Sequence, residues 1–198
     1  MAKPRKSIKH LGLSFGAEDI FLIELEHTIG KFRIVKTISF ELDFPFNYET
    51  IKDKKAPRKI GNALLKAIKE NNISTKEIAI SLDLSHVVII QVPVDANLKE
   101  KEIEDQVTWE LSQYINSPVN LYNYDYHKNS ISTKKNIIQL VIVGTRKSII
   151  EFLVETVSYA GLQLNLVDVD IFAALNAFKT NYNIAPKGKI CLLYTSDA

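Results

Sequence analysis

The sequence predicts an α/β protein in which helices cover β-sheets in layers and one subdomain is inserted into another. Three observations support this fold class. A run of strands joined by short turns opens the chain, and amphipathic helices then alternate with further strands. A strand–helix–strand–strand–helix unit precedes the final strand and helix. The hydrophobic fraction of 46% and the charged fraction of 24% are typical of a folded chain of 198 residues.

The first three strands are predicted where β-branched and apolar residues alternate with polar ones. They cover residues 10–15, 20–26 and 32–42. Residues 16–19 and 27–30 separate them and carry the glycine and aspartate that tight turns favour. These runs therefore predict an antiparallel meander. Residues 43–57 contain two prolines and several lysines without periodicity, so we expect a loop there.

Helices and strands alternate in the middle of the chain. Apolar residues at helical spacing predict a helix over residues 58–71, which should pack on the meander. Residues 77–94 form a second β-rich region, with an interruption expected at 81–85. The clearest helical pattern follows over residues 99–115, where Asn116-Ser117-Pro118 stops the helix.

The helix predicted at residues 99–115 has one apolar stripe and one unusual aromatic residue. At about 100° per residue, Trp109 projects to nearly the opposite side from the stripe. We expect Trp109 to pack within the chain, because a large aromatic side chain is seldom left bare, with partner contact or solvent exposure as the alternatives. The predicted stripe consists of Ile103, Val107, Leu111, Tyr114 and Ile115.

The last third of the chain predicts three strands and two helices. A helix over residues 147–160 should end at Gly161, because glycine is the usual helix C-terminal residue. A second helix should run to Phe178, with Asp170 as its N-terminal cap. The predicted strands are residues 121–127, 136–144 and 162–169.

Charge and composition exclude several classes of function. A formal net charge of +2 gives no general electrostatic footprint for nucleic acid. Four basic residues near the start are interpreted as a solvated leader, with anionic lipid or nucleic acid as the alternative contact. They are Lys3, Arg5, Lys6 and Lys9. The basic run from Lys52 to Lys59 is interpreted as a solvated loop and helix start, with anionic lipid as its alternative.

The sequence predicts a cytoplasmic protein without a metal site or catalytic residue. No apolar run approaches the roughly 20 residues that span a bilayer, and the start lacks the apolar segment of a signal peptide. Cys191 is the single cysteine, so no internal disulfide can form. The four histidines lack metal-ligand spacing, and no Walker-type loop is present.

Residues 11–20, Leu-Gly-Leu-Ser-Phe-Gly-Ala-Glu-Asp-Ile, resemble the first phosphate loop of the actin-like ATPases. In that superfamily an Asp-x-Gly turn brings backbone amides to a nucleotide phosphate, and the aspartate helps to organise the cation. Here Ser14 stands at the aspartate position, followed by Gly16 and Ala17. Loss of the carboxylate removes a hard oxygen ligand for Mg²⁺. The resemblance therefore implies a degenerate nucleotide loop, and the plain alternative is a hairpin turn.

A second resemblance covers nearly the whole chain. Residues 108–118, Thr-Trp-Glu-Leu-Ser-Gln-Tyr-Ile-Asn-Ser-Pro, resemble the Trp-Glu-x-x-Gln-Tyr-Ile-x-x-Pro stretch of PilM. The chain is thus similar to the PilM family of type IV pilus assembly proteins, which are actin-like and related to FtsA. Flanking segments continue the resemblance in the same order at residues 78–82, 92–94, 140–147, 160–162 and 167–175.

This resemblance implies an actin-like (ribonuclease H-like) N-terminal lobe with an inserted SHS2-type subdomain. Residues 1–76 and 162–198 would form the discontinuous actin-like subdomain 1A, and residues 77–161 the inserted subdomain 1C. An expected strand at residues 188–194 is followed by four residues in place of a second Asp-x-Gly turn. We interpret this ending as a truncated gene model or a foreign tail, with the second actin-like lobe absent.

The family resemblance also implies a function. It implies a cytoplasmic scaffold, peripheral to the inner membrane, that grips the N-terminal tail of a PilN-like membrane protein in a groove near the two subdomains. Self-association is a further option, and we expect no nucleic-acid partner. We expect no enzyme activity and no cofactor in this fragment, with ATP and Mg²⁺ as options in a full-length protein.

The sequence is also compatible with an enzyme. The chain could be the N-terminal fragment of an active actin-like ATPase, in which Asp170 would match an acidic residue that positions water. We favour the helix cap for Asp170, because a lone carboxylate does not make an ATPase. An FtsA-like role in cell division and a GspL-like role in type II secretion are equally compatible with the fold class.

Overall fold

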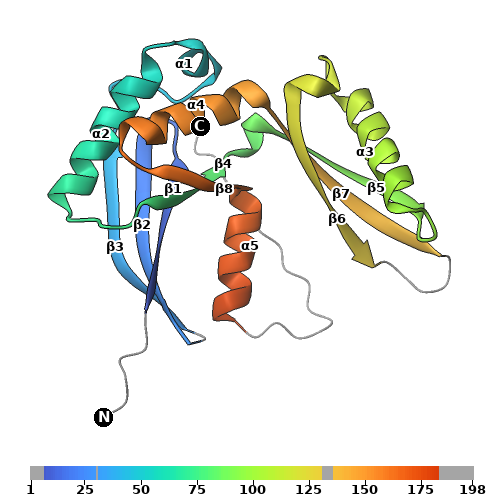
Figure 1. Cartoon of the computed structure of the whole chain (residues 1–198), viewed down its shortest axis with the longest axis horizontal. Helices are drawn as coiled ribbons and strands as arrows, with labels where there is room; N and C mark the ends of the chain where they lie inside the picture. Colours follow the sequence, from blue (N-terminus) through green and yellow to red (C-terminus); the bar gives the residue numbers. More distant parts are fainter. Residues whose placement is uncertain (1–6, 30, 131–135, 183–198) are drawn as a thin grey trace.

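The structure is a computed structural model that describes residues 7–29, 31–130 and 136–182. It contains two β-sheets, each with its own apolar core (Figure 1). The larger sheet has the order β3-β2-β1-β4-β8 and the smaller sheet the order β5-β7-β6. The α/β fold class and the order of elements are therefore confirmed.

The larger sheet joins the predicted meander to two parallel strands. β1 pairs with β2 and β2 with β3 in antiparallel fashion, whereas β4 and β8 run parallel to β1. The hairpin between β1 and β2 closes where the Gly16 amide donates to the carbonyl of Asp19 at 2.8 Å. The five strands are β1 (Ile8–Phe15), β2 (Asp19–Thr28), β3 (Lys31–Glu41), β4 (Glu77–Leu82) and β8 (Gln163–Val169).

Helices α2 (Ala56–Glu70) and α4 (Lys147–Tyr159) cover one face of the larger sheet and complete its core. They approach very closely at Gly61. A Cβ atom at this position would lie 2.4 Å from the Cβ of Tyr159 and 2.5 Å from the carbonyl oxygen of Thr156. Only glycine therefore fits at this crossing without moving one of the helices.

The expectation of a loop over residues 43–57 is wrong in part. Helix α1 (Tyr48–Lys52) lies within this stretch, and α2 begins before it ends. The side chain of Asn47 caps α1 by accepting hydrogen bonds from the amides of Glu49 and Thr50, at 3.0 and 3.1 Å. A helix of five residues is too short to show periodicity, so its cap is the only sequence signal.

The smaller sheet carries one helix on one face. Its strands are β5 (Val87–Asp95), β6 (Tyr122–Ser130) and β7 (Ile137–Arg146), and its helix is α3 (Glu100–Tyr114). Short 3₁₀ turns at Leu84–His86 and Val119–Leu121 lead into β5 and β6. The predicted stripe of α3 is buried except at Tyr114, which is 61% exposed. Tyr114 is the last residue of α3.

The smaller sheet and its helix cover fewer residues than the expected inserted subdomain. Residues 77–161 were assigned to that subdomain, but β4 pairs with β1 and β8 in the larger sheet. The buried side chains of α4 belong to the core of the larger sheet. The smaller sheet and its helix therefore occupy residues 87–146. Residues 183–198, expected in the first subdomain, lie outside the described residues.

The last described helix, α5 (Asp170–Asn181), follows β8 directly. Figure 1 shows α5 running away from the end of β8 on the side of the sheet opposite α2 and α4, with the smaller sheet beyond it. Among the described residues, no helix combines the length and apolar character that crossing a bilayer requires.

Candidate functional site

The structure brings together two of the residues predicted for a degenerate nucleotide site, Ser14 of the loop and Asp170. The Ser14 hydroxyl lies 3.5 Å from the Oδ1 atom of Asp170, across a sequence separation of 156 residues. Asp170 is the first residue of α5, whose N-terminal cap is Val169, and its side chain makes no capping hydrogen bond. The expectation that Asp170 caps this helix is therefore wrong. Its carboxylate instead faces the end of β1, where the actin-like loop has its aspartate.

The loop after Ser14 is held by the protein itself. The Gly16 amide is used in the β1–β2 hairpin, and the Ala17 carbonyl accepts from the amide of Phe46 at 2.8 Å. A Cβ atom at Gly16 would lie 3.2 Å from the Phe21 ring, so the glycine also permits a close approach there. Gly16 and Ala17 therefore form part of the β1–β2 turn, in which the Gly16 amide donates within the hairpin, and a nucleotide-binding role for them stays a prediction.

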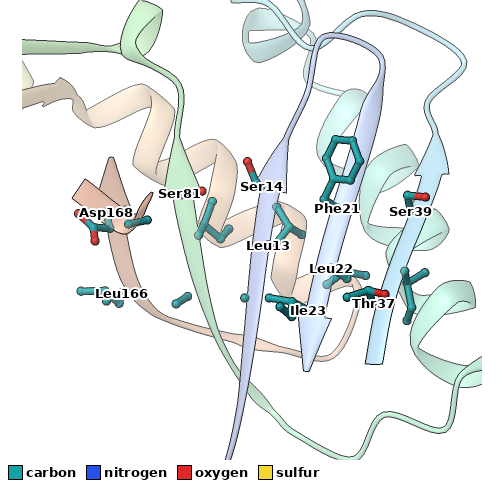
Figure 2. Close-up of a pocket in the computed structure, with 15 residues that line it drawn as sticks. Leu13, Ser14, Phe21, Leu22, Ile23, Thr37, Ser39, Ser81, Leu166 and Asp168 are labelled. Carbon is teal, nitrogen blue, oxygen red and sulfur yellow. The ribbon is translucent and has the colours of Figure 1, made fainter. Parts of the chain in front are cut away.

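A shallow cavity of about 550 Å³ lies on the face of the larger sheet opposite α2 and α4. Figure 2 shows Ser14, Ser39, Ser81 and Asp168 among its labelled side chains, on neighbouring strands, with the ring of Phe21 at its border. The face combines hydroxyl groups with partly exposed apolar side chains. Ser14 therefore belongs to this open face of the sheet.

A larger groove of about 740 Å³ separates the two sheets, and we call it the inter-sheet groove. One wall consists of the face of β6 and β7 that points away from α3, and the other consists of β8 and α5. Its apolar lining includes Val141, Val143, Val169, Phe172 and Leu175. The apolar lining of the inter-sheet groove thus comes from both sheets and from α5.

Strand β6 borders this groove and is an edge strand. It pairs with β7 on one side and with no other described strand on its second side. Alternate side chains of β6 point into the groove, namely Asn123, Asp125, His127 and Asn129. An edge strand offers a row of backbone donors and acceptors to an added strand. The inter-sheet groove therefore combines apolar lining, polar side chains and a strand edge.

Trp109 does not pack in either core. Its side chain is 57% exposed on the outer face of α3, so the expectation that it packs within the chain is wrong. The buried face of α3 is fully occupied by Ile103, Val107 and Leu111 against the sheet, which leaves no room for the indole. Contact of Trp109 with a partner stays a prediction.

The sequence of this chain matches a known protein family. The family model described as type IV pilus assembly protein PilM matches residues 12–191. The chain belongs to the PilM family. This membership confirms the resemblance found in residues 108–118 and the actin-like fold class. The PilM-family match spans both sheets, so the smaller sheet is part of the family architecture.

Two solved structures resemble this PilM-family chain. The PilM–PilN type IV pilus biogenesis complex matches with a TM-score of 0.73 and 21% identity, over 87% of this chain and 50% of that chain. The cytoplasmic domain of EpsL, an inner-membrane component of the type II secretion system of Vibrio cholerae, matches with a TM-score of 0.57 and 11% identity, over 84% of this chain and 59% of that chain. The chain therefore spans about half the length of the first of these proteins.

The family resemblance implied a groove near the two subdomains, but sequence reasoning did not identify the residues that line the inter-sheet groove, although β7 carries a signal for them. The segment Ile-Ile-Gln-Leu-Val-Ile-Val at residues 137–143 is apolar at most positions on both faces of the strand. A sheet with one helix layer needs apolar residues on one face only. The apolar second face of β7, which includes Val141 and Val143, therefore indicates that something other than α3 covers this side of the smaller sheet.

Proposed function

We propose that this PilM-family chain is an actin-like scaffold of the type IV pilus assembly platform, which holds the extended N-terminal tail of a PilN-like membrane protein in the inter-sheet groove. In this proposal residues 87–146 form the inserted subdomain 1C, and the larger sheet belongs to subdomain 1A. The protein would lie in the cytoplasm, at the inner membrane through its partner.

The observation that carries the proposal is the apolar groove bordered by the edge strand β6. An extended peptide that adds to a strand edge gains backbone hydrogen bonds, while pockets take alternate side chains and provide specificity. Val143 on β7 and Leu175 on α5 lie on opposite walls, so apolar side chains of a peptide would be buried between them. Removing apolar surface from water is favourable by about 25 cal/mol per Å², and ordering of the peptide offsets part of this gain on binding.

The same structure favours a scaffold over an enzyme. Ser14 provides a neutral hydroxyl where the actin-like loop has a carboxylate, and the Gly16 amide is engaged in the hairpin. Asp170 is the one carboxylate that contacts Ser14 among the described residues. We therefore propose that this chain does not bind Mg²⁺ and ATP tightly, and calorimetry that gave a stoichiometric, tight isotherm would overturn this.

The binding proposal is tested with a labelled synthetic peptide that copies the N-terminal tail of a PilN protein, and with a scrambled peptide of the same composition. Fluorescence anisotropy should show saturable binding of the first peptide and none of the second. Absence of binding at high micromolar concentration, with the protein shown to be folded by circular dichroism, refutes the scaffold proposal.

Two variants of α5 test whether the peptide binds in the inter-sheet groove. Leu175→Asp places a charge on the groove wall and should weaken peptide binding about tenfold or more, because the peptide would bury a carboxylate in place of an apolar side chain, and Lys179 one turn later offsets only part of that cost. Ala177→Asp adds the same charge to an exposed position of the same helix that does not line the groove, and should leave binding unchanged. Equal effects of the two variants would place the peptide elsewhere.

A further inference from the structure

A second cavity lies at the junction of the two sheets, and we call it the junction cavity. Its volume is about 500 Å³. It is formed where the segment before α1, the 3₁₀ turn before β5, and the end of β7 come together. The side chains that define its chemistry are Asn47, Tyr48, His86, Tyr122 and Arg146. None of these residues belongs to the proposed peptide groove.

Arg146 is held in this cavity by two aromatic rings. Its guanidinium carbon lies 5.9 Å from the centre of the Tyr48 ring and 5.6 Å from the centre of the Tyr122 ring. Tyr122 is itself buried in the core of the smaller sheet, which makes that side of the clamp rigid. Because contact with ring faces uses none of the guanidinium N–H donors, these donors stay available for a planar acceptor.

The charge of Arg146 is not matched by an ion pair in the part of the chain that the structure describes. Arg146 is also half-buried. A partly desolvated charge without a counter-ion is costly, and the cation–π contacts offset only part of that cost. An incoming carboxylate would supply the missing charge and two parallel hydrogen bonds.

The rest of the lining determines what kind of molecule fits. Burial lowers the pKa of His86, so at neutral pH its imidazole is uncharged and Arg146 is the cation of the cavity lining among the described residues. Phe46, Val88 and Ile149 give the cavity an apolar wall. The Thr145 hydroxyl donates to the His86 carbonyl at 2.8 Å, which ties the 3₁₀ turn before β5 to the end of β7.

We propose that the junction cavity binds an organic carboxylate in which the anionic group is attached to an apolar body, with Arg146 as the bidentate donor and the apolar wall against the body. Such a carboxylate can come from a free small molecule or from an acidic side chain next to an apolar residue in a protein partner. Both sources share this chemistry, and the experiment separates them.

The test uses two matched pairs of probes and chemical-shift mapping by NMR on the whole chain. Phenylacetate is compared with phenylacetamide, and the capped tripeptide acetyl-Phe-Glu-Phe-amide with acetyl-Phe-Gln-Phe-amide. Each carboxylate should bind about tenfold or more tightly than its amide, with shifts at Tyr48, Tyr122 and Arg146. Binding of the tripeptide alone identifies a protein partner as the source, and binding of phenylacetate identifies a small molecule.

Variants decide whether Arg146 is responsible. Arg146→Gln should remove the preference for carboxylate over amide, and Arg146→Lys, which keeps the charge without the planar fork, should retain part of it. Arg58→Gln removes an exposed charge from α2 and should change nothing. The proposal is overturned if acid and amide bind equally, or if neither carboxylate binds at about 10 mM, a concentration that would nearly saturate even a site with a Kd of about 1 mM. It is also overturned if inorganic phosphate binds as well as the carboxylates, or if Arg146→Lys folds and retains the full preference for carboxylate.

Discussion

Gly61 allows α2 and α4 to touch, and replacing it with alanine tests the packing of the larger core. The added methyl group would lie 2.4 Å from the Cβ of Tyr159 and 2.5 Å from the carbonyl oxygen of Thr156. Carbon atoms normally rest about 3.5–4.0 Å apart. The two helices must therefore separate locally by about 1 Å, and the Thr156 oxygen is a backbone atom that cannot rotate away.

Two opposing terms set the size of the effect. Overpacking of a well-packed core costs about 1–3 kcal/mol, and the backbone contact places Gly61→Ala near the upper value, about 3 kcal/mol. Alanine in a helix interior is about 1 kcal/mol more favourable than glycine. The net destabilisation is therefore about 2 kcal/mol, which corresponds to a Tm lower by about 4–8 °C for a chain of this size.

Thermal and urea unfolding followed by circular dichroism at 222 nm measure this difference. Asn62→Ala is the matched control, because Asn62 is exposed on the same helix and alanine should raise stability there by about 0.5 kcal/mol. If Gly61→Ala has the same Tm as the wild type or a higher one, the close approach of α2 and α4 does not exist in solution and the reasoning is refuted.

Two further predictions concern ionisable groups. The hydrogen bond to Glu100 raises the pKa of Tyr126 to about 12, so the stability that this bond contributes should be complete below pH 10 and lost as the pH rises through 12. Absorbance at 295 nm should show a late titration of Tyr126 that Tyr126→Phe removes. Glu24 is 1% exposed and accepts from Lys9 at 3.3 Å and Thr75 at 3.1 Å. Lys9→Met leaves this buried carboxylate without its cation and should lower the free energy of unfolding by about 1–3 kcal/mol, measured by urea unfolding. The loss should be smaller than for a fully buried ion pair, because Lys9 reaches solvent. The control Lys31→Met, on the exposed start of β3, should cost less than about 0.5 kcal/mol in the same assay. Equal midpoints for the two lysine variants would mean that Glu24 does not depend on Lys9.

Much of the fold was predictable because long elements carry periodic signals. Helices α2, α3 and α4 each repeat apolar residues at helical spacing over three or more turns, and the meander alternates with clear turn residues between its strands. Helix α1 was missed because five residues cannot show a period. The position of Gly161, with φ of +70°, matches its predicted role at the end of α4.

The sites were less predictable, because they depend on contacts between distant residues. Ser14 and Asp170 each had a local interpretation in the sequence, and only the parallel pairing of β1, β4 and β8 brings them together. The same holds for Arg146, whose neighbours Tyr48 and Tyr122 come from separate segments. For Trp109 the direction of the side chain was predicted, but not that its side of α3 is uncovered.

The chain enters and leaves the smaller sheet at one place. Val87 at the start of β5 pairs with Thr145 near the end of β7, so the two crossings are neighbouring strands (Figure 1). An insert whose ends lie side by side can change its length or sequence without altering the path of β4 or α4. The smaller sheet can therefore diverge in length and sequence, while the larger sheet keeps its register and its core.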